Sequence, residues 1–371
     1  MSAKALYVHV PFCLKICAYC DFCHVLYQKE LADRWLDAVQ EELSARVRTR
    51  NLKTIYIGGG TPSSLSCAQL DRLLTMLDPF ASLVKEYTLE INPESLSAEK
   101  AACMVHHGIN RASLGYQTNN AQLLRQMNRI ANASDVIKAM AVLRDVGITN
   151  LSLDILYSLP SQTMAQLQEA VEAAIAMKPK HLSLYSLTIE PHTLFAAKKL
   201  KPCDAETEAD MYEWICARLE KAGFAQYELS NFARDGYAAQ HNWIYWEYED
   251  FYGIGCGAWG KEKDVRYEHT RSIRAYCENP KAIMETRLSI AEQMFENVMM
   301  GMRLRQGMDT VRFVERYGQR VQDVYPRSIA FLQDNGLIEP DFSSRLQATK
   351  RGYVILNSVL EVFLEESHID S

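Results

Sequence analysis

Short apolar segments alternate with longer helical patterns through the first half of the chain. Stretches of β-branched, leucine and aromatic residues predict buried strands over 5–10, 54–57, 87–91, 112–114, 151–156 and 181–187. Apolar residues recur at helical spacing between them, which predicts helices over 31–48, 68–77, 98–107, 135–146 and 163–177. Capping boxes begin at Ser66 and Thr163 and support two of these helix starts. The alternation predicts βα units in series and hence a parallel sheet.

Six βα units are fewer than the eight that close a full (β/α) barrel, so the predicted fold class is α/β, an incomplete (β/α)6 barrel. Ligands of such sheets bind at the carboxyl ends of the strands. After Pro191 the pattern loosens, and helical segments with two short strands follow from Ile290. We therefore predict a barrel over 1–225, an aromatic-rich extension over 226–289 and a mainly helical, winged-helix-like domain over 290–371.

Composition narrows the class of protein. The chain has 371 residues, of which 48% are hydrophobic and 23% charged, enough to bury a large core and a smaller one. Its net charge of −6 is not gathered into blocks, and no lysine-rich face stands out, so nucleic acid is not an expected partner. No apolar run approaches the roughly 18 residues of a membrane helix, and the first ten residues lack a secretory pattern. We expect a cytoplasmic chain with no membrane span.

Four of the ten cysteines lie close together after the first predicted strand: Cys13, Cys17, Cys20 and Cys23. In a reducing compartment such clustering indicates metal binding rather than disulfides. Cys13, Cys17 and Cys20 offer three thiolates from one loop, and a 4Fe-4S cluster held by three cysteines keeps one iron open. Zinc with Cys23 or His24 as a fourth ligand is the alternative, although the second cysteine pair of a zinc finger is absent.

This three-cysteine spacing at the end of the first strand resembles the signature of the radical S-adenosylmethionine (SAM) superfamily. The resemblance implies that the open iron binds the methionine part of SAM, and that an electron donor reduces the cluster. The run 58–62 is similar to the glycine-rich element that binds the amino group of SAM. Polar residues at the ends of the following strands, Glu90, Gln117 and Asp154, predict a shared pocket.

Longer stretches resemble the oxygen-independent coproporphyrinogen III oxidase family and its close relatives, the HemW heme chaperones. The matching segments occur in the same order, at 6–13, 58–62, 90–93, 113–118, 128–130 and 153–160. By that resemblance the residues that contact SAM are Tyr7, Tyr19, Gly59, Gly60, Thr61, Glu90, Gln117, Arg129 and Asp154. Ser158 and Ser161 stand where the family usually has glycine, so the turn at this point departs from the family pattern.

Two features favour the heme chaperones over the oxidases. The oxidases have a further cysteine two positions after the third and a longer arm ahead of the motif, whereas here Phe22 follows Asp21. The segment 241–246 resembles the His-Asn-x-x-Tyr-Trp motif linked to heme binding, and an imidazole can ligate iron while aromatic rings cover a porphyrin. By resemblance the heme-binding residues are His241, Asn242, Tyr245 and Trp246.

His241 is then the leading candidate for the axial ligand of heme iron. Cys256 and His24 are further candidates, because Trp259 replaces the histidine usual in a Gly-Ala-His-Gly segment of the chaperones. From physical chemistry alone, an aromatic core around a hydrogen-bonded histidine is the alternative interpretation.

The resemblance implies a radical-SAM-type heme chaperone that passes heme to a recipient apo-hemoprotein, with no residue assigned a catalytic role. The alternatives are oxidative decarboxylation of coproporphyrinogen and modification of another tetrapyrrole by a radical SAM enzyme. The sequence leaves open whether SAM is cleaved and whether two chains form a homodimer.

Overall fold

A sheet of twelve strands dominates the structure, a computed structural model that describes residues 3–369. Its strand order is β14-β13-β12-β11-β1-β4-β5-β6-β7-β8-β10-β9. Six central strands are parallel and follow chain order: β1 (Ala5–Val10), β4 (Thr54–Gly59), β5 (Glu86–Ile91), β6 (Arg111–Gln117), β7 (Asn150–Tyr157) and β8 (His181–Ser186). The two outermost strands of the described sheet do not pair, so the predicted incomplete (β/α)6 barrel is confirmed as an open sheet.

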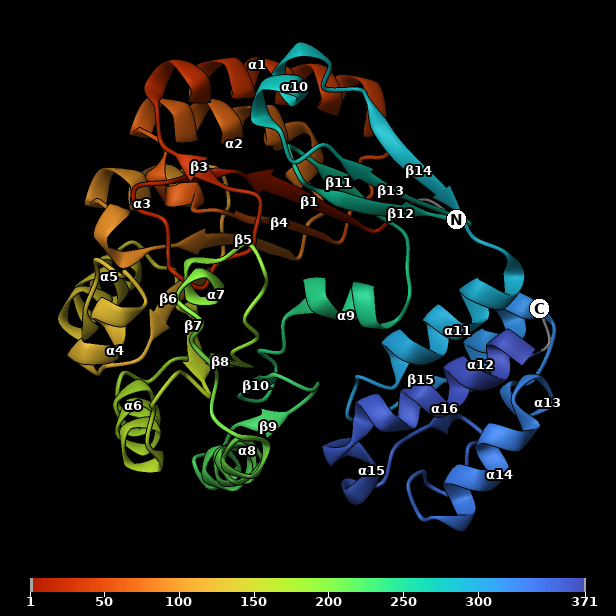
Figure 1. The fold of residues 1–371 in the computed structure, drawn as a ribbon. Helices are drawn as coiled ribbons and strands as arrows, with labels where there is room; N and C mark the ends of the chain where they lie inside the picture. Colours follow the sequence, from red (N-terminus) through yellow and green to blue (C-terminus); the bar gives the residue numbers. More distant parts are fainter. Residues whose placement is uncertain (1–2, 370–371) are drawn as a thin grey trace.

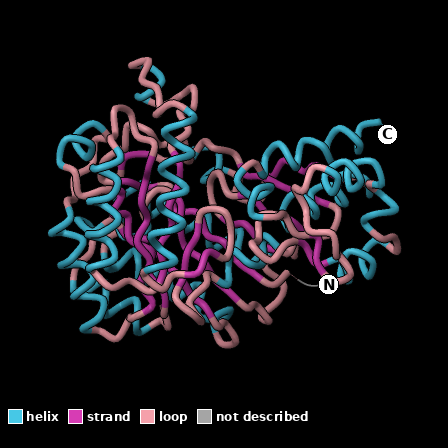
Figure 2. The backbone as a smooth tube through the Cα atoms, turned by 90° about the horizontal axis from the view of Figure 1, so that it is seen from below, coloured by secondary structure: helices cyan, strands magenta, loops and turns pink. Residues whose placement is uncertain are grey.

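Helices between the parallel strands cover the outer face of the curved sheet (Figure 1). They are α1 (Lys29–Arg46), α2 (Cys67–Ala81), α3 (Ala98–His106), α4 (Ala121–Gln126), α5 (Ala133–Asp145) and α6 (Met164–Ala176), and two further helices, α7 (Leu194–Ala197) and α8 (Ala205–Lys221), follow β8. The capping boxes at Ser66 and Thr163 are both formed, which confirms these two predicted helix starts. Seen as in Figure 2, the strands run through the interior of this part, with helices along its outer side.

The predicted aromatic-rich extension adds strands to both edges of the same sheet. On the edge beside β8 lie β10 (Asn231–Ala233) and β9 (Ala225–Gln226). On the edge beside β1 lie β11 (Phe251–Ile254), β12 (Trp259–Glu262), β13 (Val265–His269) and β14 (Ile283–Arg287), with α10 (Ile273–Glu278) against α1. The chain crosses from one edge to the other through α9 (Gln240–Trp246), which lies on the inner side of the sheet (Figure 1).

The C-terminal region is a mainly helical domain with its own apolar core, as predicted. Its elements are α11 (Ile290–Gly301), β15 (Met308–Asp309), α12 (Thr310–Tyr317), α13 (Val321–Val324), α14 (Pro326–Asp334), β16 (Arg345–Leu346), α15 (Lys350–Val354) and α16 (Leu356–Ile369). Phe313, Leu332 and Phe363 are fully buried in that core. Ile355 leaves helical geometry at φ −110° and ψ 35° and separates α15 from α16.

Two local features bear on the sequence expectations. Ser158 and Ser161 both adopt left-handed backbone conformations, with φ of 58° and 63°, so the turn keeps the geometry that glycine adopts without strain. Within residues 3–369, the helices are all too short or too polar to cross a membrane.

Candidate functional site

A cavity of about 530 Å³ opens where the central parallel strands end. Residues predicted from the sequence make up much of its lining: Cys13, Cys17, Tyr19, Cys20, Gly59, Gly60, Thr61, Glu90, Gln117, Arg129, Asp154 and Asn242. The other four predicted site residues, Tyr7, His241, Tyr245 and Trp246, are outside this lining. The fold therefore brings the cysteine loop, the glycine-rich run and the polar strand ends together around one space.

The cysteine loop is closed at its base by a short parallel pair, β2 (Phe12–Cys13) and β3 (Val25–Leu26). Burial raises the pKa of the Cys13 thiol to about 11 and that of the Cys20 thiol to about 12. Bonds to a metal centre favour the deprotonated thiolate and would offset this cost of burial. Three thiols from one loop on a cavity wall therefore fit the donor set of an iron–sulfur cluster.

The turn after α4 holds the loop in place. The Ala18 amide donates to the Met127 carbonyl over 2.9 Å, and the Asn128 side-chain amide donates to the Ile16 carbonyl over 2.7 Å. Asn128 adopts a left-handed conformation with φ of 62°, which asparagine tolerates better than most residues. These bonds join the cysteine loop, which lies between β1 and α1, to a segment more than a hundred residues away.

Arg129, which follows the same turn, contacts the cysteine loop from inside the cavity. One guanidinium nitrogen lies 3.6 Å from the Cys17 sulfur, and another donates to the Asn92 side-chain oxygen over 3.0 Å and to the Gly115 carbonyl over 2.8 Å. Its Nε is buried and has no hydrogen-bond partner in the described chain. A cationic group with a spare donor beside the cluster loop suits an anion such as the carboxylate of SAM.

The glycine-rich run passes close against the cysteine loop. A Cβ atom on Gly60 would lie 3.0 Å from the Cys13 sulfur and 2.9 Å from the Phe12 carbonyl oxygen. Gly59 has a φ of 116°, which side chains other than hydrogen rarely allow. Glycine is thus required here by the contact with the loop, and the main chain itself forms this wall of the cavity.

Glu90 on β5 and Asp154 on β7 add two carboxyl groups to the cavity lining. The Glu90 carboxyl accepts hydrogen bonds from the Tyr56 hydroxyl at 2.7 Å and the Gly59 amide at 3.2 Å, and Asp154 accepts from the Ser113 hydroxyl at 3.0 Å. Burial raises the pKa of Glu90 to about 7, and it also raises the pKa of Asp154. Because buried carboxylates gain from a cationic partner, this wall suits the positively charged sulfonium of SAM.

His241 lies far from the cysteines, near the beginning of the strands. Its Nδ1 is 2.7 Å from the Thr54 hydroxyl oxygen and its Nε2 is 2.7 Å from the Tyr245 hydroxyl oxygen. Thr54 begins β4 and Gly59 ends it, about 17 Å away at 3.3 Å per residue. Burial lowers the pKa of His241 to about 3. Both ring nitrogens are engaged within the protein, which argues against the axial role predicted for His241.

The side chains of Asn242, Tyr245 and Trp246 point in different directions. Asn242 faces the cavity, whereas Tyr245 pairs with His241. Trp246 lies against the C-terminal domain, beside Leu304 and Arg312. The Glu86 carboxylate accepts the amide hydrogens of Gln240 and His241 and so anchors the start of α9. In this structure the segment 241–246 packs beneath the cavity.

The remaining candidates have distinct surroundings. Cys256 is fully buried, with its sulfur 3.5 Å from the Cys23 sulfur, and donates to the Thr270 carbonyl. Cys23 is thus paired away from the cavity, and neither thiol faces a ligand there. His24 does line the cavity, with its Nδ1 3.6 Å from the Cys20 sulfur.

Tyr7 sits beneath the loop rather than on the cavity wall. Its hydroxyl oxygen lies 2.9 Å from His9 Nδ1, and His9 Nε2 lies 2.8 Å from the Cys23 carbonyl oxygen. The predicted contact of Tyr7 with SAM stays a prediction, and the observed contacts support the end of the cysteine loop.

Sequence reasoning missed several cavity residues, among them Tyr56, Asn92, Arg111, His181, Ser183 and Tyr185. On β6, Arg111, Ser113, Gly115 and Gln117 all line the cavity, because alternate residues of a strand face one side. The sequence prediction considered only the residues at the strand ends, so it missed the alternate residues that face the cavity earlier in the strand. Arg111 brings a buried guanidinium to the floor, where only 2% of the residue is exposed.

Comparison with known proteins agrees with this geometry. Residues 7–174 match the radical SAM superfamily, and residues 288–355 match the HemN C-terminal domain. The solved structure of coproporphyrinogen III oxidase (HemN) from Escherichia coli, described as a radical SAM enzyme, is similar with a TM-score of 0.83. It is 21% identical and covers 97% of this chain and 90% of its own, so it shows the shared fold alone. Fold and cysteine loop together define a radical SAM protein.

Relatives with higher sequence identity show which family within this superfamily the chain belongs to. The heme chaperone HemW of Bacillus subtilis is 35% identical over 98% of this chain and 100% of its own length. The heme chaperones HemW of Lactococcus lactis and Escherichia coli are 36% and 32% identical over 97% and 98% of this chain, and cover 97% and 98% of their own lengths. The chain belongs to the HemW family.

Proposed function

We propose that this chain is a heme chaperone of the radical SAM type, which binds a 4Fe-4S cluster, SAM and heme and delivers heme to a recipient apo-hemoprotein. The observation that carries the proposal is the similarity to relatives named heme chaperones, at 35% and 36% identity over nearly the whole chain. Phe22 at the position of the further oxidase cysteine, two after Cys20, supports the same assignment. Decarboxylation of coproporphyrinogen is the alternative that these observations disfavour.

In this proposal Cys13, Cys17 and Cys20 hold the cluster. The cluster supplies one-electron reduction from an external donor and an open iron that binds SAM. Arg129 holds the carboxylate end of SAM through its unpartnered Nε, and the buried carboxyl group of Glu90 faces its positive charge. These residues bind and orient, and none of them is assigned a proton transfer.

We place heme at the mouth of the cavity rather than beside His241. Phe22 and Tyr185 both line the cavity and expose 69% and 41% of their surface, which suits the flat face of a porphyrin. His24 is the candidate imidazole on the same rim. Lys15 also lines the cavity and provides a cation for a heme propionate.

Hemin titration of the anaerobically reconstituted chain tests this placement. His24→Ala is expected to weaken hemin binding about tenfold or more and to change the absorbance of the bound heme. His241→Ala is expected to leave both unchanged, and His192→Ala, which removes an exposed histidine, serves as the matched control. Loss of binding in His241→Ala with normal binding in His24→Ala would overturn the rim site and restore the motif prediction.

The chaperone activity itself is tested by transfer. Heme-loaded chain is mixed with an apo-hemoprotein, and the recovery of the recipient's heme absorbance is followed. In parallel, the reconstituted chain receives SAM, a reductant and coproporphyrinogen III, and the tetrapyrroles are separated by chromatography. We expect heme transfer and unchanged coproporphyrinogen. Formation of protoporphyrinogen would overturn the proposal in favour of the oxidase, and a differently altered tetrapyrrole would favour a modifying enzyme.

A further inference from the structure

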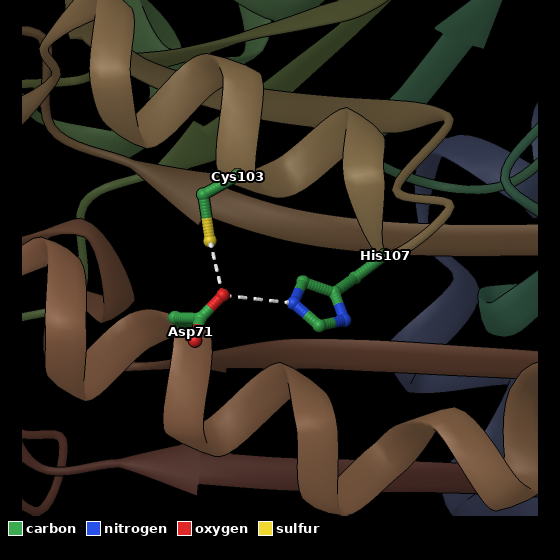
Figure 3. A group of neighbouring side chains, drawn as sticks. All are labelled: Asp71, Cys103 and His107. Atoms are coloured by element: carbon green, nitrogen blue, oxygen red, sulfur yellow. Dashed lines mark hydrogen bonds and ion pairs between the residues drawn. The ribbon is translucent and has the colours of Figure 1, made fainter.

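A second group of metal-binding side chains lies outside the cavity, between α2 and α3 (Figure 3). It consists of Asp71, Cys103 and His107, whose ligand atoms all lie within 4.8 Å of one another. The Asp71 carboxylate oxygen is 3.1 Å from His107 Nε2 and 3.7 Å from the Cys103 sulfur. Neither the cysteine loop nor the cavity lining includes any of these residues.

The spacing of the residues explains why they meet. Cys67 and Asp71 are four residues apart on α2, and Cys103 and His107 are four apart at the end of α3. Residues four apart share one face of a helix, so Cys103 and His107 both face Asp71 on α2.

The distances match a tetrahedral zinc site. With zinc bonds of about 2.3 Å to sulfur, 2.1 Å to nitrogen and 2.0 Å to oxygen, tetrahedral angles separate sulfur from oxygen by about 3.5 Å and nitrogen from oxygen by about 3.4 Å. The corresponding separations here are 3.7 Å and 3.1 Å. Both separations therefore lie within about 0.3 Å of the ideal values.

Asp78 holds the histidine in the orientation that metal binding needs. Its two carboxylate oxygens lie 2.9 Å and 3.0 Å from His107 Nδ1, on the side of the ring opposite Nε2. A ligating histidine in proteins characteristically donates its other ring N–H to a carboxylate, which fixes the tautomer and leaves the second nitrogen for the metal. With Asp78 bonded to Nδ1, Nε2 faces Asp71 and pairs with its carboxylate when protonated, and a metal ion between them would take the place of that proton.

We propose that Asp71, Cys103 and His107 bind a zinc ion between α2 and α3. Thiolate and imidazole donors select zinc over magnesium or calcium, which prefer oxygen ligands. The ion links the two helices that follow β4 and β5, and α2 begins directly after the glycine-rich wall of the cavity. Its role is therefore to stabilise the outer layer behind that wall.

Zinc binding to the full, cluster-loaded chain tests the proposal. The reconstituted protein is incubated with zinc sulfate and passed over a desalting column with a competing chelator, and zinc and iron are measured in the same sample. We expect about one zinc per chain in the wild type. Cys103→Ser and His107→Gln should bind zinc at least about a hundredfold more weakly, and Asp78→Asn about ten- to a hundredfold more weakly. The iron content should stay constant, which shows that the chain is folded and that zinc has not displaced the cluster.

A matched control and a spectrum make the outcome decisive. Cys277→Ser removes a half-buried cysteine on α10 and should leave zinc binding unchanged. X-ray absorption at the zinc edge should show sulfur, nitrogen and oxygen neighbours together. Failure of the wild type to retain zinc, full retention by Cys103→Ser and His107→Gln, or a zinc shell without sulfur would each overturn the site.

Discussion

The buried carboxyl group of Glu90 makes the stability of this protein depend on pH in a way that one substitution can isolate. Burial raises its pKa from the ordinary 4.5 to about 7. One pKa unit corresponds to about 1.4 kcal/mol, so ionisation of Glu90 costs the folded chain about 3 kcal/mol. The side chain is half-buried on the cavity wall, and the Tyr56 and Gly59 hydrogen bonds only partly offset this cost.

The sign of the effect follows from the direction of this pKa change. Between about pH 4.5 and pH 7 the folded chain binds a proton at Glu90 more tightly than the unfolded chain does. The stability contributed by protonated Glu90 is complete below pH 4.5 and is lost as the pH rises through about 7. Glu90→Gln has no ionisable group at this position, so its stability should not show this fall as the pH rises.

Thermal unfolding of the SAM-free protein measures the difference. Between about pH 5.5 and pH 8 the wild type should lose about 2 kcal/mol relative to Glu90→Gln. With an unfolding entropy of about 2.1 cal/mol/K per residue, the gap between the two Tm values should change by about 3 °C. Any constant effect of the amide on the hydrogen bonds cancels across the pH series. Glu30→Gln, which removes an exposed carboxylate on α1, controls for the loss of one charge. A gap in Tm that stays constant with pH, or moves the other way, would refute the reasoning.

Three further substitutions probe other parts of the structure. Asn128→Ala removes a 2.7 Å hydrogen bond to the cysteine loop, so the reconstituted variant should release iron to a chelator faster than the wild type. An equal rate would contradict the role of this bond in holding the loop. Gly253→Ala places a Cβ 1.7 Å from the Trp259 carbonyl oxygen and should cost about 3 kcal/mol or more in urea unfolding; a loss under about 1 kcal/mol would disprove the close approach. Tyr276→Phe deprives the buried Glu42 of a hydroxyl donor at 2.6 Å, and we expect a loss of about 1–3 kcal/mol, with wild-type stability as the contrary result.

Local sequence patterns were sufficient to predict the strands of the barrel and the cysteine loop. The six predicted strands correspond to β1 and to β4 through β8, because strand length and apolar content depend on neighbouring residues. Cys13, Cys17 and Cys20 were recognisable for the same reason, since three donors on one short loop need no distant partner. The glycine-rich run and the polar strand ends could be placed at one edge because parallel strands all end there.

Contacts between distant segments decided the rest. Whether His241 faces a ligand or the core depends on where α9 packs, and its partner Thr54 lies 187 positions away in the sequence. Cys23 stands next to the cluster cysteines in the sequence, yet it pairs with Cys256 because β11 lies beside β1 in the sheet. Asp71 and His107 meet only because α2 packs against α3. The sequence by itself determined that three thiols lie together on the cysteine loop, since that loop is local. Only the tertiary structure decided which imidazoles and thiols remain free, because hydrogen bonds and burial depend on neighbours that no local pattern records.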